Sequence, residues 1–428
     1  MRLREVISKG SVAVVEEGLF AGSNFLIGVL LARWLQPVDY GTFTAAYSLF
    51  LLLGTAFYSA ICVQPVLVLA RREHASRFRQ YFGCLLWMHV GVASIMSIAI
   101  AAIAAFLWFL GSIGLAKTFL ALSLAGPFIT LLWLARRAHY ALLKPYWPLC
   151  AGVLYLVLLV LGCYALARTN WLSPQSALIV IGAASLASSV PLIALIGPRR
   201  WVRGSDLTPR TTLIQHWRYG KWSALTSSMR WSSNYAYYLL LPLYLGLEAG
   251  AVLRVHMNLL LPILHANSAV YGILIPQFAK VANLESSREF RRFTCAVLAL
   301  YGVGALMFWG LLIVFAQPIF DLLYGGQYHA DIRLLALLGL LPLSGGIAGV
   351  LESALFASGR PKLATMSYAT SALMTLTVGW GLLVTNGVMG AGMGLLVASV
   401  AAAAAMAWSF IRATRHEDFA ARPIQPRD

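Results

Sequence analysis

The chain has 428 residues, of which 60% are hydrophobic and only 11% are charged, and its formal net charge is +17. This composition lies well beyond the range of soluble proteins and excludes an ordinary water-soluble enzyme or binding module. The positive charge does not indicate nucleic acid, because the basic residues lie beside long apolar stretches, where lipid headgroups are the natural partners.

The apolar stretches predict about twelve transmembrane helices, since one crossing requires roughly 20 residues. We expect spans at 12–34, 42–69, 81–110, 118–135, 146–167, 176–197, 221–245, 252–276, 293–316, 331–357, 363–385 and 390–411. Of the 32 Lys and Arg residues, 26 lie on alternate links between these spans, among them the link that begins at Arg136. Because cytoplasmic loops are enriched in Lys and Arg, this alternation predicts that both termini are cytoplasmic.

The longest internal link divides the chain near its middle. It is rich in basic residues and contains Gly, Pro and Ser-Asp. We therefore expect an N-terminal six-helix bundle over residues 1–200, a basic cytoplasmic linker over 201–220, a C-terminal six-helix bundle over 221–411 and a cytoplasmic tail over 412–428. The external links are too short to fold as a domain.

The two halves resemble each other in sequence. Four correspondences occur in the same order, namely Gly22–Phe25 with Ser232–Tyr235, Asp39–Gly41 with Glu248–Gly250, Pro127 with Pro342, and Lys144-Pro145 with Arg360-Pro361. They predict a parallel repeat about an axis along the membrane normal, with the substrate between the halves near mid-membrane. The alternative is a chance alignment of apolar sequence.

Polar residues inside the spans are the candidates for a substrate-binding cavity, because intramembrane charges usually face a bundle interior or a wet cavity. In span seven, Ser223, Ser227, Arg230, Asn234 and Tyr237 follow a helical spacing, and in span eight Arg254, Asn258, Pro262 and His265 do so. An arginine fork suits a pyrophosphate. The cavity candidates are Arg230, Asn234, Arg254, Asn258, His265 and Asn24.

Each of these residues also has a structural interpretation. Arg254 could lie at the outer interface and extend its charge toward water, and Arg230 could belong to a structural ion pair. His265 and the nearby His256 are more often packing residues than ligands.

Three acidic residues inside predicted spans are candidates for ion coupling, namely Glu16, Glu17 and Glu352. Glu16 or Glu17 could bind a proton or a sodium ion, or form a buried pair with Arg230 in the symmetry-related helix. Alternatively, both could lie at the membrane interface. We find no catalytic constellation, metal motif or P-loop, and therefore expect no enzyme activity and no cofactor.

Three further stretches resemble the polysaccharide flippases of the Wzx type, in the MOP superfamily with the MATE exporters and the lipid II flippases. These stretches are Leu31–Phe43, Leu322–Tyr328 and Leu355–Lys362. The resemblance implies a V-shaped pair of bundles around a central cavity that works by alternating access. Family members often have fourteen helices, and the chain has twelve predicted spans.

The resemblance also implies an activity. The expected function is export of undecaprenyl-pyrophosphate-linked oligosaccharides across the bacterial cytoplasmic membrane, beside a polymerase and glycosyltransferases. A MATE-type exporter of small cations is the alternative, which Glu16 and Glu17 favour and Arg230 and Arg254 oppose. A polymerase or ligase fits less well, because the external links are short. The sequence leaves open the glycan, the driving force and the oligomeric state.

Overall fold

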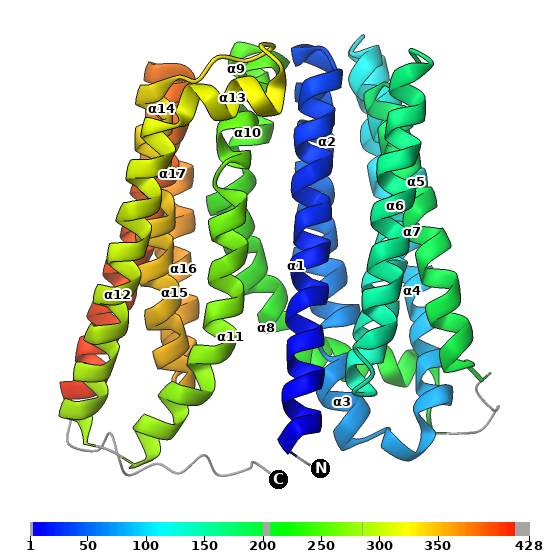
Figure 1. Cartoon of the computed structure of the whole chain (residues 1–428). Helices are drawn as coiled ribbons and strands as arrows, with labels where there is room; N and C mark the ends of the chain where they lie inside the picture. Colours follow the sequence, from blue (N-terminus) through cyan, green and yellow to red (C-terminus); the bar gives the residue numbers. More distant parts are fainter. Residues whose placement is uncertain (1–2, 200–205, 285, 416–428) are drawn as a thin grey trace. The chain divides into compact units, whose positions relative to one another are not determined.

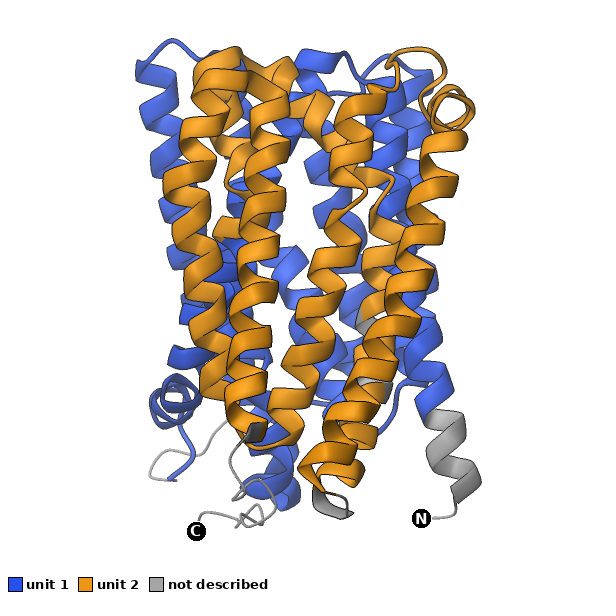
Figure 2. Cartoon of the chain, turned by 90° about the vertical axis from the view of Figure 1, so that its left-hand side faces the viewer, with its two compact units in different colours: residues 1–231 blue, residues 232–428 orange. Residues whose placement is uncertain are grey.

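The computed structural model describes residues 3–199, 206–284 and 286–415, which contain helices and turns but no β-strand (Figure 1). The prediction of an all-helical, multi-pass membrane protein is confirmed. The chain forms two compact units, Met1–Trp231 and Ser232–Asp428 (Figure 2).

The first unit contains the six predicted N-terminal spans. Its elements are α1 (Leu3–Trp34), α2 (Pro37–Leu51) with a π-helical continuation (Leu52–Val63), α3 (Val66–Arg72), α4 (Phe78–Phe109), α5 (Ile113–Ala141), α6 (Tyr146–Arg168), α7 (Pro174–Ile196) and most of α8 (Pro209–Tyr235). Helix α5 is the most buried of the spans and packs against both α4 and α7. Gly182 of α7 lies so close to α5 that a Cβ there would be 2.9 Å from the Ala125 Cβ, as expected where small residues let helices approach in a bilayer.

The second unit is built around α15. Its elements are α9 (Tyr237–Leu245), α10 (Leu247–Asn258), α11 (Leu261–Leu284), α12 (Ser287–Val314), α13 (Ala316–Tyr324), α14 (Ile332–Leu338), α15 (Leu341–Ala357), α16 (Pro361–Met374) and α17 (Trp380–Arg415), with a π-helical turn (Thr375–Gly379) before α17. Helix α15 packs against α11, α12 and α17. The core between them includes Phe278, Phe290, Leu355, Met406 and Phe410.

The described residues contain nine helical segments that are long and apolar enough to cross a membrane, or ten if the bent pair α10 and α11 forms one span. Two features account for the difference from twelve. Helix α8 falls outside the count because it carries many polar side chains, and α9 because it has only nine residues. Residues Pro361–Thr414 count as a single span, although Gly387 has non-helical backbone angles between the two predicted spans.

The boundary between the units lies inside α8, later than the expected linker over 201–220. Residues 200–205 lie outside the described part, and α8 already begins at Pro209. The first half of α8 packs on unit 1, where His216 is fully buried. Its Nδ1 contacts the Ile61 carbonyl oxygen at 2.7 Å and its Nε2 contacts the Tyr81 hydroxyl at 2.6 Å. These contacts join this segment to the first unit.

His216 has one ring nitrogen for each of these partners. Burial lowers the pKa of His216 to about 4, so the imidazole is neutral near pH 7. A neutral ring carries one N–H, and the Ile61 carbonyl can only accept. Nδ1 therefore donates to Ile61, and Nε2 accepts from the Tyr81 hydroxyl. Both polar ends of the buried ring are satisfied.

Two of the four pairs that define the predicted repeat lie at helix starts in both halves, whereas Pro127 lies inside α5 and Pro342 at the start of α15. Asp39 and Glu248 both occupy the first turn of a helix, α2 and α10 respectively. Pro145 is the N-cap of α6, and Pro361 is the first residue of α16. Both pairs therefore occur at equivalent helix starts in the two halves.

Candidate functional site: a buried charge cluster in the first unit

Glu16 is a completely buried carboxylate on α1. The apolar span of this helix begins at Gly10, so Glu16 lies about 9 Å along it at 1.5 Å per residue. A buried carboxylate without partners would cost several kcal/mol. The residues that contact Glu16 therefore determine whether α1 can pack with this carboxylate buried.

Arg136 of α5 supplies the main partner. Its Nε donates to Glu16 Oε1 at 2.6 Å, and its Nη2 lies 3.4 Å from Glu17 Oε2. The guanidinium also lies over the Phe20 ring, 3.8 Å from the centroid. One turn further along α5, the Tyr140 hydroxyl donates to Glu16 Oε2. Both carboxylate oxygens of Glu16 are thus engaged by protein groups.

The other two charged residues of the cluster are more exposed. The Glu17 side chain is 70% exposed, so its contact with Arg136 contributes little to stability. Arg137 is half-buried, and its Nε has no hydrogen-bond partner among the described residues. Two acids and two arginines therefore balance in formal charge, with Glu16 and Arg136 as the tightly coupled pair.

The link that was expected to begin at Arg136 begins later in the structure. Helix α5 continues to Ala141, so Arg136 lies within the helix and is buried. We considered a pair between Arg230 and Glu16 or Glu17. The structure instead pairs both acids with Arg136. Glu16 is buried within the first unit, whereas Glu17 is exposed.

Glu352 is a buried acid of the second unit. It lies on α15, and its Oε2 accepts a 2.6 Å hydrogen bond from the Tyr368 hydroxyl of α16. Glu352 precedes Arg360-Pro361 by eight residues, as Arg136 precedes Lys144-Pro145. The predicted repeat therefore has an acid in one half where the other half has a base.

The six cavity candidates are distributed over four helices. Asn24 is half-buried on α1, Arg230 and Asn234 are exposed on α8, and His265 is exposed on α11. Arg254 of α10 is half-buried, with its guanidinium 5.5 Å from the centre of the Tyr238 ring. Asn258 is buried at the end of α10.

The predicted polar stripes do not run along continuous helices. The axis bends by 54° between α10 and α11, and Pro262 is the second residue of α11. A proline cannot donate the backbone hydrogen bond that would continue the helix. Arg254 and Asn258 are thus on a different helix from His265. The stripe of span seven also ends early, because Tyr237 belongs to α9 and is buried.

His256 is a packing residue, which confirms its structural interpretation. Its Nδ1 lies 2.8 Å from the Val252 carbonyl oxygen, and its Nε2 accepts from the Asp331 backbone N–H at 3.1 Å. Both ring nitrogens thus serve to join α10 to the start of α14.

Comparison with known proteins identifies relatives in sequence and in structure. Residues 30–333 match the family described as polysaccharide biosynthesis protein. No curated protein sequence matches the chain.

Several solved structures share the fold. The inward closed form of the lipid II flippase MurJ has a TM-score of 0.70 at 15% identity, over 94% of this chain and 87% of that chain. An inward-facing multidrug resistance MATE family transporter of the MOP superfamily has a TM-score of 0.68 at 16% identity, over 92% and 94%. A MOP superfamily transporter from Pyrococcus furiosus, described as having a binding pocket of reverse polarity, has a TM-score of 0.63 at 13% identity, over 95% of both chains. These identities establish the fold alone.

Proposed function

Because the chain belongs to the polysaccharide biosynthesis protein family, we propose that it translocates undecaprenyl-pyrophosphate-linked oligosaccharides across the bacterial cytoplasmic membrane. The match over residues 30–333 is the observation that carries the proposal. The MOP transporter fold supports a flippase or transporter. In this proposal the protein works by alternating access, has cytoplasmic termini, and delivers its cargo to a polymerase after glycosyltransferases have assembled it.

The Glu16–Arg136 pair favours this function over cation export. An acid that binds a transported proton or sodium ion needs an oxygen that the ion can reach. Glu16 uses one oxygen for Arg136 and the other for Tyr140. We therefore assign a structural role to Glu16 and ion coupling to Glu17 or Glu352.

The phosphate-binding role is assigned to arginines outside this pair. Arg230 has an exposed side chain on α8, and Arg254 is half-buried on α10. A guanidinium can bind phosphate oxygens through two parallel hydrogen bonds. Asn24, Asn234, Asn258 and His265 are proposed to contact the cargo as polar groups.

A MATE-type exporter of small cations is the second candidate. It rests on the likeness of fold to the multidrug transporters, whose TM-scores are close to that of the lipid II flippase.

Depletion of the protein separates the two functions. In cells that make the polysaccharide, depletion should abolish surface polysaccharide and cause the undecaprenyl-linked oligosaccharide to accumulate. The control is a strain that lacks the polysaccharide because its first glycosyltransferase is deleted. Depletion should change the sensitivity to cationic dyes no more than this deletion does. Normal surface polysaccharide together with raised retention of a cationic dye would reject the flippase and favour the exporter.

A further inference from the structure

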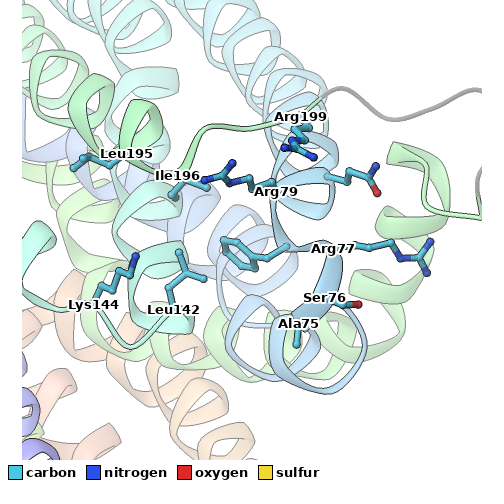
Figure 3. A pocket seen from close by; sticks show the side chains of 11 residues that line it. Ala75, Ser76, Arg77, Arg79, Leu142, Lys144, Leu195, Ile196 and Arg199 are labelled. Carbon is cyan, nitrogen blue, oxygen red and sulfur yellow. The ribbon is translucent and has the colours of Figure 1, made fainter.

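A basic pocket opens at one end of the first unit, and none of its lining residues belongs to the Glu16–Arg136 cluster. It has a volume of about 490 Å³ and lies between the start of α4, the turn from α5 to α6, and the end of α7 (Figure 3). Its charged lining residues are Arg77, Arg79, Lys144 and Arg199, and none of the described residues that line it is acidic.

Three of these four cations lack a neutralising group among the residues that the structure describes. Arg77 forms an ion pair with Asp206 at 3.0 Å and points away from the other three in Figure 3. The side chains of Arg79, Lys144 and Arg199 make no hydrogen bond or ion pair with any residue in the described ranges. Like charges held around one pocket repel each other unless an anion lies among them.

The backbone holds these three residues in place. The Arg199 N–H donates to the Arg79 carbonyl oxygen at 3.0 Å, which fixes the end of α7 beside the start of α4. Lys144 follows Leu143, whose φ of 58° lies in the left-handed region that side chains rarely adopt. The Lys144 N–H closes this turn on the His139 carbonyl oxygen at 3.0 Å.

The rest of the lining combines two polar residues, Ser76 and Gln80, with apolar side chains. Phe78 and Ile196 are buried in its wall, and Leu195 exposes about half of its side chain. The pocket also lies where apolar spans end, since α5 ends at Ala141 and α7 at Ile196. A ligand with an anionic head and an apolar tail matches both parts of this surface.

The second unit offers a contrast. By the predicted repeat, Arg360 corresponds to Lys144, since each precedes the proline that starts the next helix. The Arg360 Nη1 donates to the Ala413 carbonyl oxygen at 2.8 Å. A basic residue at this point thus has a protein partner in one unit, whereas Lys144 has none in the described part of the other.

We propose that this pocket binds the phosphate headgroup of an anionic membrane phospholipid, held by Arg79, Lys144 and Arg199. The site goes beyond the proposed transport function and does not depend on it. A basic residue near an anionic lipid surface contributes about a fivefold gain in affinity, so the three together account for about a hundredfold.

Lipid binding to the purified full-length protein tests the proposal. Native mass spectrometry would compare phosphatidylglycerol with phosphatidylcholine for the wild type and for the combined variant Arg79→Gln, Lys144→Gln and Arg199→Gln. The wild type should prefer phosphatidylglycerol, and the variant should lose about a hundredfold in affinity for it. The matched control removes three arginines from α12, Arg288→Gln, Arg291→Gln and Arg292→Gln, and should keep the wild-type affinity.

Further arms make the result decisive. If the combined variant fails to fold, Lys144→Gln alone should show about a fivefold loss. Excess inorganic phosphate should leave the bound phosphatidylglycerol in place, and its displacement would assign the pocket to a free phosphate compound. Equal affinity for both lipids, or an equal loss in the α12 control, would overturn the proposal.

Discussion

Replacing Arg136 with glutamine should remove most of the folded protein from the membrane. The substitution leaves the Glu16 carboxylate fully buried with only the Tyr140 hydroxyl as a partner. Removing one member of a buried ion pair typically costs about 3–5 kcal/mol, because the remaining charge is not compensated. That is a large share of the stability of a typical protein. Membrane abundance and the unfolding temperature of the purified protein measure the effect.

Two variants make this prediction specific. Arg137→Gln removes the neighbouring charge on the same helix and should change the abundance little, since Arg137 forms no salt bridge in the described residues. The double variant Glu16→Gln with Arg136→Gln should recover much of the lost abundance, because no buried charge is left. If Arg136→Gln were as abundant as Arg137→Gln, the pair would not stabilise the first unit.

Replacing Arg230 with alanine should have the second large effect, on export rather than on folding. The side chain is exposed on α8, so its removal leaves no cavity. If it contacts the pyrophosphate of the cargo, surface polysaccharide should be lost while the protein level stays near normal. Lysine should restore export only in part, because it retains the charge but not the bidentate geometry.

Arg218 provides the matched control, because it is also an exposed arginine on α8 and lies within the basic segment before the predicted span. Arg218→Ala should leave export unchanged. Full export by the Arg230→Ala variant at the wild-type protein level would remove Arg230 from the cargo site.

The sequence was sufficient to predict the six spans of the first unit. Each of them is a long apolar run bounded by polar or basic residues, and this pattern follows directly from the thickness of the bilayer. The pattern was less informative from α8 onward. Helix α8 is polar, the helix axis bends before Pro262, and the backbone at Gly387 is not helical. The flanking sequence stays apolar at the last two points, so hydrophobicity alone does not reveal these breaks.

The Glu16–Arg136 pair was not predictable from hydrophobicity. The two residues are 120 positions apart, and only the packing of the bundle brings them together. Arg136 lies close to the end of an apolar run, where a charge usually indicates a loop. Helix α5 instead continues to Ala141 and carries the guanidinium to a buried acid. An acid near the end of one span and a base near the end of another are a signal for such a pair. The signal does not identify which residues are partners.

The most direct test of the central claim is transport by the purified protein. Proteoliposomes would be loaded on the outer leaflet with an undecaprenyl-pyrophosphate-linked oligosaccharide, and an impermeant glycosidase would then report the fraction that has moved inside. The account predicts that vesicles with the wild-type protein protect the sugar faster than empty vesicles, and that vesicles with the Arg230→Ala variant do not. Equal protection in wild-type and empty vesicles, with the same protein moving a cationic dye, would contradict it.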